Sequence, residues 1–302
     1  TANSSSNTGT AGQGGIPNEG GGGGGFFGNG GLSAHGGDTP ASSYQNGASG
    51  GIVGALAPHV PENWNAKKQF QLESLLYSQK FWKSVDSVSG LNSGYRRTGR
   101  LQPLMDEHSV ALAQKRKESA DNLWQNFATW DIIDNSKDWN LTSPTGLWIF
   151  DTLSAIIYPK LACLSLAQAL KNKGCEFLLD GKNLGKVIWA TGIHDLNRIS
   201  IKLEKNFGNG VKGQAALFKL TKPNSVQLFA ETLHFIPHFD GTVAIGSTSE
   251  RNFEHENTND DNLNALILKA SNILPELKGK DPICTWANVR PRSSSRAPVL
   301  GK

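Results

Sequence analysis

The chain has 302 residues, 37% of them hydrophobic, which is enough for one large domain or two modest ones. Its 30 basic and 26 acidic residues leave a formal net charge of +4, too even a balance to require nucleic acid or an anionic membrane as a partner. Cys163, Cys175 and Cys284 lie far apart, so neither a disulfide framework nor a zinc site is predicted, and a cytoplasmic location fits best. No apolar run reaches the length of about 18 residues that a membrane helix needs, so we expect no membrane partner.

Residues 1–50 differ in composition from the rest of the chain. They hold half of the 34 glycines and no Lys or Arg. With few apolar side chains to offset the conformational entropy of an ordered chain, this segment is predicted to be low-complexity and disordered.

From Gly51 onward the pattern is globular. Apolar residues at helical spacing predict four helices, over 63–88, 108–130, 159–173 and 261–274. Short β-type runs predict six strands, over 146–150, 176–179, 186–190, 214–220, 234–237 and 242–246, with Asp240-Gly241 as a hairpin turn. The fold class is therefore α/β (α+β), with part of a doubly wound layer over 159–190 and an antiparallel sheet over 90–150 and 211–288.

One predicted strand ends in a way that suits a ligand. The apolar run Val187-Ile188-Trp189 stops at Ala190-Thr191-Gly192. Ligands of open α/β sheets sit beyond the carboxyl ends of such strands, where small residues let the backbone approach closely. The same ending also occurs at ordinary strand-to-turn transitions, so this hexapeptide alone does not decide between the two interpretations.

Five segments in order carry a family resemblance. They are Gly51-Ile52-Val53-Gly54-Ala55-Leu56-Ala57-Pro58-His59, Val187–Gly192, Val211-Lys212-Gly213-Gln214, 234–250, and Trp286–Ser293 with Pro298-Val299-Leu300-Gly301. Together they resemble FAD-dependent oxidoreductases of the glycine oxidase and D-amino-acid oxidase family. The resemblance covers 51–301 and implies FAD as cofactor, a small-molecule amine or amino acid as substrate, and hydride transfer from substrate to flavin.

The resemblance also implies roles for particular residues. Gly54, Ala55, Leu56 and Ala57 match the small-residue segment that passes the flavin ring, and Ala190, Thr191 and Gly192 match the segment beside the FAD diphosphate and ribose. Arg290 matches the arginine that pairs with the substrate carboxylate, although an arginine beside Pro291 could also be a solvated loop cation. His234 stands where glycine-oxidase-like enzymes place a substrate-facing tyrosine. No catalytic base and no metal ligand is predicted.

The family pattern further implies a division into interleaved segments. Residues 51–88, 153–210 and 289–302 would belong to the FAD domain, and 89–152 and 211–288 to the substrate domain. The family's opening strand, G-x-G-x-x-G turn and helix is not recognisable in residues 1–50: Gly23, Gly25 and Gly28 fit the glycine spacing, but no apolar strand precedes them. The chain also stops at Lys302, where family members continue to a flavin-contacting end. We therefore expect this polypeptide to bind FAD weakly or not at all, and both an active and an inactive oxidoreductase remain open for this form.

Two alternatives remain open at this point. One is an FAD oxidase domain that modifies a wobble uridine of tRNA, for which Lys67, Lys68, Arg96, Arg97 and Arg100 could form a basic face. The other is a non-catalytic glycine-rich fusion that carries an oxidase remnant.

Overall fold

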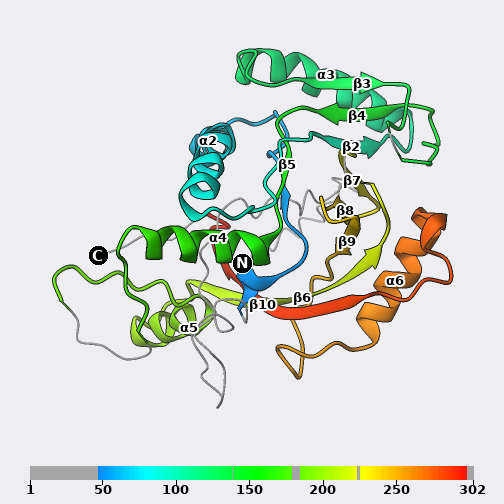
Figure 1. Ribbon diagram of the computed structural model, residues 1–302. Coiled ribbons are helices and arrows are strands. Elements are labelled where there is room, and N and C mark those ends of the chain that lie inside the picture. Colours follow the sequence, from blue (N-terminus) through cyan, green and yellow to red (C-terminus); the bar gives the residue numbers. More distant parts are fainter. Residues whose placement is uncertain (1–46, 138, 179–183, 223–224, 298–302) are drawn as a thin grey trace, which may run out of the picture.

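A computed structural model describes residues 47–137, 139–178, 184–222 and 225–297 (Figure 1). Most of the predicted disordered segment, the glycine pattern at 23–28 and the motif 298–301 lie outside these ranges. None of the helices in the described part is both long and apolar enough to cross a membrane.

The molecule is built on one mixed sheet of eight strands. All neighbouring strands pair antiparallel except β2 and β7, which pair parallel. In spatial order the strands are β10 (Cys284–Ser293), β6 (Gly208–Lys219), β9 (Thr242–Gly246), β8 (Leu233–Pro237), β7 (Gln227–Ala230), β2 (Arg100–Pro103), β4 (Trp148–Asp151) and β3 (Trp130–Ile133). β10 and β6 lie side by side along ten residue pairs, as the red and yellow-green arrows of Figure 1 show. A second sheet pairs β1 (Ala55–Leu56) with β5 (Ala155–Ile156).

The helices begin and end at local signals. Asn65 caps α2 (Ala66–Ser89), and Gly90, at φ 70°, ends it in the left-handed conformation that glycine adopts readily. Asp106 and Ser109 form a capping box at α3 (Glu107–Leu123), and Pro159 opens α4 (Pro159–Asn172). The remaining α-helices are α5 (Ile193–Lys202) and α6 (Asp261–Ile273), and single 3-10 turns form η1 (Ala48–Gly50) and η2 (Pro275–Leu277).

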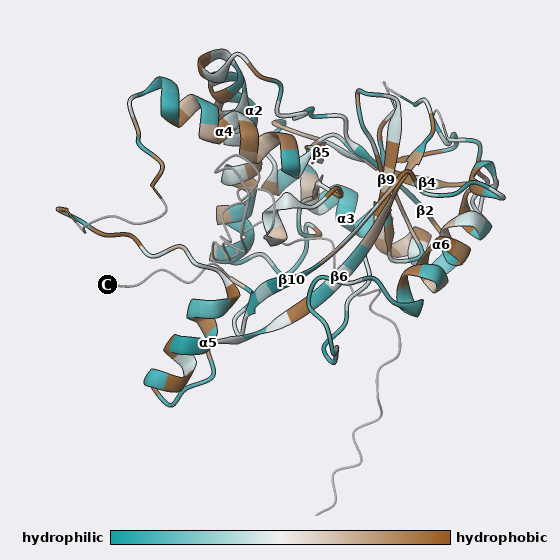
Figure 2. Ribbon diagram, turned by 60° about the horizontal axis from the view of Figure 1, so that its bottom comes forward, coloured by the Kyte–Doolittle hydropathy of each residue, from teal (hydrophilic) through white to brown (hydrophobic). Residues whose placement is uncertain are grey.

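The two faces of the large sheet are covered differently. One face is covered by α6 and is called the helix face, and on it Phe218 and Phe235 pack with Leu266 of α6. On the opposite face, which we call the segment face, Ala215 and Ile236 pack with Ile52. The central strands and the sheet-facing side of α6 are brown in Figure 2, whereas the outer surfaces are largely teal. A third cluster packs α2 and α4 around Trp82, Trp124 and neighbouring residues.

Most predicted elements are confirmed. The mixed α/β class and the helices at 63–88, 159–173 and 261–274 appear as α2, α4 and α6, and the strands at 146–150, 214–220, 234–237 and 242–246 appear as β4, β6, β8 and β9. The turn at Asp240-Gly241 is present, and the three cysteines form no disulfide. The division into FAD and substrate segments stays a prediction, although β6 and β10 run across two of its boundaries.

Three expectations were wrong. The run 186–190 is not a strand but an exposed, irregular segment: the exposed fraction is 89% for Ile188 and 66% for Trp189. In the described residues no strand pairs with it, and an apolar run becomes a strand only where a neighbour takes its backbone hydrogen bonds. Residues 176–178 are likewise not a strand, and 179 lies outside the described ranges. The helix expected to reach Trp130 ends at Leu123, because Trp130 begins β3.

A glycine with no room for a side chain gives a test of this packing. A Cβ on Gly54 would lie 2.1 Å from the carbonyl oxygen of Ile157, whereas one on Gly51 would lie 3.4 Å from Trp286, an ordinary contact. We expect Gly54→Ala to lower the free energy of unfolding by about 1–3 kcal/mol or more, and Gly51→Ala to change it little. Urea unfolding of both variants checks this, and equal stabilities would contradict the described path of residues 51–57.

Candidate functional site

Residues 51–57 run across the segment face of the large sheet. The Gln227 side chain donates to the carbonyl of Leu56 at 3.5 Å, and a Cβ on Gly246 would lie 2.9 Å from Val53. The predicted flavin-facing residues of this segment are therefore in close contact with the sheet. Leu56 and Ala57 are buried, and Ala55 is half-buried.

Arg290 lies on the same face. It pairs with Val211 across β10 and β6, so its side chain points to the side opposite Lys212. Its guanidinium covers Gly213, where a Cβ would be 3.2 Å from the Arg290 Cζ atom. Nη1 donates to Ser247 Oγ at 3.1 Å and Nη2 to the carbonyl of Thr248 at 3.0 Å. Arg290 is thus a half-buried side chain held in one orientation, rather than a solvated loop cation.

His234 is buried on β8, which is separated from β6 by β9, and it lies opposite Gly246 of β9. Its ring lies 4.6 Å from that of Phe229, and its Nδ1 is buried without a hydrogen-bond partner in the described structure. Burial, assisted by the charge of Arg100, lowers the pKa of His234 to about 3. The imidazole is therefore neutral at physiological pH.

A series of contacts along the segment face connects His234 with Arg290 and with residues 51–57. His234 pairs with Gly246, the next residue Ser247 accepts from Arg290, and Val53 covers Gly246. This face therefore carries a fixed cation and a neutral imidazole, and Val53 of the segment 51–57 covers Gly246 between them. No sequence pattern indicates Ser247 or Thr248 as the anchors of Arg290, since these contacts span more than 40 residues.

The second predicted cofactor segment lies elsewhere. Ala190 is exposed, and Gly192, at φ 67°, immediately precedes α5, where Thr191 Oγ1 hydrogen-bonds Asp195. α5 packs against β6 and β10, whereas 54–57 lie against β5. The roles of Ala190, Thr191 and Gly192 toward a cofactor stay predictions.

The residues on the segment face fit one side of a flavin. A flavin ring is flat and requires backbone groups and small side chains beside it, and Val53 and Ala55 are half-exposed small side chains on this face. Glycine at position 54 is required by packing rather than by a flavin, because Ile157 fills the space that a side chain would occupy. The unpartnered Nδ1 of His234 suits a polar substrate atom on this face.

The basic face considered for RNA does not form. Arg100 is buried and paired with Asp151 at 3.1 Å, and Arg96 donates to the carbonyl of Pro237. Arg97 donates to two backbone carbonyls. The RNA alternative is therefore not supported, because these guanidinium groups donate to carbonyls and a carboxylate within the fold.

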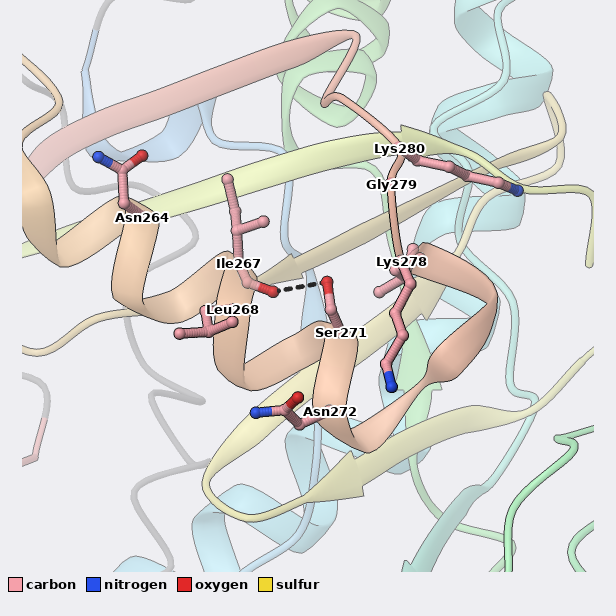
Figure 3. Close-up of a pocket in the computed structure, with 9 residues that line it drawn as sticks. Asn264, Ile267, Leu268, Ser271, Asn272, Lys278, Gly279 and Lys280 are labelled. Carbon is pink, nitrogen blue, oxygen red and sulfur yellow. Dashed lines mark hydrogen bonds between the residues drawn. The ribbon is translucent and has the colours of Figure 1, made fainter.

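A hollow lies on the surface of α6 (Figure 3). This helix covers the face of the sheet opposite Arg290. Its lining includes Leu268, Ser271, Lys278 and Lys280. In the described ranges no group of three or more His, Cys, Asp or Glu side chains could hold a metal ion.

The arrangement of sheet, covering segment and helices defines the class of FAD-binding oxidase folds. The structure resembles a glycine oxidase from Geobacillus kaustophilus with a TM-score of 0.67 and 15% identity, over 85% of this chain and 76% of that one. It also resembles an iminodiacetate oxidase from Chelativorans sp. BNC1, with a TM-score of 0.66 and 16% identity, over 85% of this chain and 78% of that one. At these identities the likeness concerns the fold.

The chain belongs to the FAD dependent oxidoreductase family, which matches residues 37–302. FAD is the cofactor of this family, as the resemblance implied. A glycine oxidase of Pseudomonas putida is 36% identical over 94 residues, which are 30% of this chain and 25% of that protein. A glycine oxidase of Pseudomonas aeruginosa is 35% identical over 94 residues, which are again 30% of this chain and 25% of that protein. The matched segment thus spans a quarter of these relatives.

The buried histidine predicts a pH dependence of stability. His234 stays neutral in the fold down to about pH 3, whereas the unfolded chain takes up a proton below about 6.5. The unfolded state therefore binds more protons between these values, and stability falls as the pH is lowered through this window. We expect wild type to lose about 2 kcal/mol more than His234→Gln between pH 7.5 and 5. Urea unfolding at both pH values measures this, with His255→Gln as the exposed control; parallel losses in wild type and His234→Gln would refute it.

Proposed function

We propose that this chain oxidises a small amine or amino acid by passing a hydride equivalent to FAD. The observation that carries the proposal is the Arg290 guanidinium, held by Ser247 and Thr248 on the sheet face that also carries the neutral His234 and residues 51–57. FAD, when bound, supplies the electron acceptor. Family membership and the glycine oxidases among the relatives support this assignment.

Arg290 would bind and orient the substrate. A guanidinium presents donors in a planar fork that matches a carboxylate, so it can fix the carbon that bears the amine in one direction. Its anchors, Ser247 Oγ and the Thr248 carbonyl, are uncharged groups. Positioning of this kind removes much of the entropic barrier to reaction.

His234 would shape the polarity of the site. A neutral imidazole adds no second positive charge beside Arg290, so a protonated amine is not repelled. Its buried Nδ1 can accept from or donate to a substrate atom, according to tautomer. Residues 51–57 would keep water from the reacting face.

The state of the cysteines supports the cytoplasm as the location, because no disulfide forms among Cys163, Cys175 and Cys284.

The role of Arg290 can be tested by substitution. We expect Arg290→Gln to weaken binding of a carboxylate substrate by about 10- to 100-fold, since a charge-assisted hydrogen bond contributes about 1.5–3 kcal/mol. Steady-state oxidation of glycine, sarcosine and D-alanine, with added FAD, gives the change in KM. The exposed Arg198→Gln serves as the control; an equal KM for Arg290→Gln and wild type would remove Arg290 from the site.

Cofactor binding is tested separately. Because the segment 184–190 is exposed and irregular, we expect weak FAD binding: no flavin retained after desalting, but a saturable change in the visible spectrum during titration with FAD. Flavin retained after desalting would contradict the expected weak affinity. The absence of any spectral change at excess FAD would contradict the proposed function of this chain.

A further inference from the structure

We propose that Lys212 is a positioning residue for Arg290: it holds residues 247–250 in place, and these in turn fix the guanidinium that receives the substrate carboxylate. This inference rests on the proposed function of Arg290. Neither the family match nor the relatives assign a role to Lys212.

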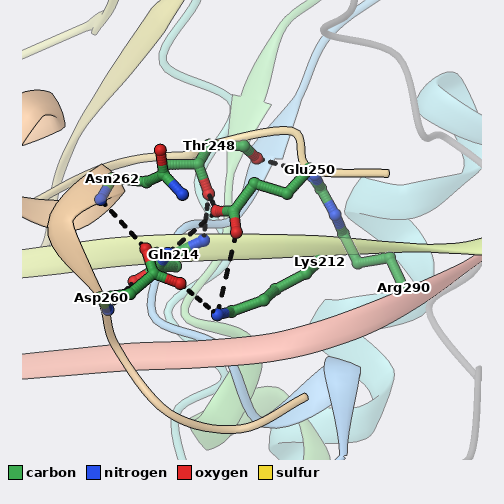
Figure 4. Close-up of polar contacts among 7 residues, drawn as sticks. All are labelled: Lys212, Gln214, Thr248, Glu250, Asp260, Asn262 and Arg290. Carbon is green, nitrogen blue, oxygen red and sulfur yellow. Dashed lines mark hydrogen bonds and ion pairs between the residues drawn. The ribbon is translucent and has the colours of Figure 1, made fainter. Parts of the chain in front are cut away.

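Lys212 and Arg290 act on opposite faces of the same strand. Along β6, Lys212 and Gln214 point to the helix face, and a Cβ on Gly213 between them would point to the segment face, where the guanidinium lies. Figure 4 shows Lys212 and Gln214 gathered with Glu250 and Asp260. Lys212 therefore does not touch a substrate bound by Arg290, and its influence has to pass through the chain between them.

A polar cluster surrounds the buried lysine. Lys212 is 1% exposed, and its Nζ lies 2.6 Å from Asp260 Oδ2 and 3.8 Å from Glu250 Oε2. Gln214 Nε2 donates to both carboxylates, at 2.9 Å to Glu250 and 2.6 Å to Asp260. Asp260 also caps α6 by accepting from the backbone of Asn262.

The cluster is joined to the anchors of Arg290 by residues 247–250. Glu250 exchanges two backbone hydrogen bonds with Lys212, each 2.9 Å long, and its carboxylate accepts from the Thr248 hydroxyl. The same hydroxyl accepts from the backbone of Gln214 at 2.8 Å. Thr248 then offers its carbonyl to Arg290. One short segment thus carries the cluster on one side and the guanidinium on the other.

The charge of Lys212 is what lets this cluster stay compact. Lys212 donates a hydrogen bond to Asp260. This bond is the largest of the effects that hold the pKa of the Asp260 carboxyl well below its usual value, so Asp260 is ionised. Without the ammonium group, the two carboxylates that share the Gln214 amide would have no cation between them, and like charges repel. Glu250 would be displaced, and the Thr248 carbonyl would move with it.

A lysine that merely stabilises the fold would behave differently. Its loss would lower the stability of the chain without a selective effect on carboxylate binding, and the effect would be the same with or without Arg290. A positioning residue loses its effect when the group that it positions is removed, which a double-mutant cycle detects.

The cycle uses Lys212→Met, Arg290→Met and the double variant, with FAD present. The probe is glycolate, a carboxylate of the size of glycine, and the dissociation constant is measured by calorimetry. We expect Lys212→Met to raise this constant about tenfold in the Arg290 background and not at all in the Arg290→Met background. An unchanged constant in the first background, or an equal rise in both, overturns the inference.

Two further variants separate position from general stability. In Lys212→Met with Glu250→Gln, the cluster regains the net charge that it has in wild type, and we expect glycolate affinity to recover. Failure to recover would overturn charge balance as the mechanism. Lys222→Met removes another lysine that pairs with a carboxylate, Glu276 at 3.4 Å, on the helix face. It should leave glycolate affinity unchanged; a loss as large as that of Lys212→Met would show a general effect.

Amide hydrogen exchange gives a measurement that needs neither FAD nor substrate. The amides of Thr248 and Glu250, bonded to Gln214 and Lys212, should exchange about tenfold faster in Lys212→Met than in Lys222→Met. If exchange is faster in Lys212→Met but Arg290→Met still binds glycolate, the proposed function is rejected, and the positioning of residues 247–250 by Lys212 is retained. If exchange is unchanged in Lys212→Met and Arg290→Met loses glycolate binding, only the role of Lys212 is rejected.

Discussion

The register between β6 and β10 is the constraint on which the site depends. Arg290 stands opposite Val211, so its side chain shares a face with Gly213, His234 and the segment 51–57. Because side chains alternate along a strand, a slip of one residue would carry the guanidinium to the helix face, among Lys212 and its carboxylates. Ten consecutive pairs and burial on both faces of β6 fix this register. The site is therefore a property of the sheet rather than of a loop.

Two polar arrangements on this sheet use opposite strategies. On the helix face, charges are gathered and balanced: one lysine lies between two carboxylates that share a glutamine. On the segment face, the imidazole of His234 is kept uncharged by burial, and a buried pair, Arg100 with Asp151, lies beyond it. β6 separates the two, so the charges around Lys212 act on the binding face through residues 247–250 rather than by direct contact.

Sequence patterns predicted the local elements and the family, but not the contacts that make the site. α4, α6 and β9 carry their signals within a few residues, such as Pro159 at a first turn and Asp240-Gly241 before a strand. The run Val187-Ile188-Trp189 failed as a strand because strand formation depends on a partner that no local pattern reports. Arg290 and His234 were found through resemblance. Their neighbours Ser247 and Thr248, and the group around Lys212, come from distant segments and carry no periodic signal.

Pro291, beside the substrate arginine, has a consequence for self-association. In the described residues β10 is an edge of the large sheet, and such an edge exposes hydrogen-bonding groups that another chain can pair with. The backbone N–H of Lys212 points toward Glu250 and therefore away from β10. Because backbone groups alternate along a strand, the N–H of Gly210 also points away from β10. Pro291 pairs with Gly210, so the nitrogen of Pro291 faces the open side of β10. The proline removes one outward donor there, and Arg290 and Arg292 place positive charge on either side of it. The strand that presents the substrate arginine is thereby also protected against edge-to-edge aggregation.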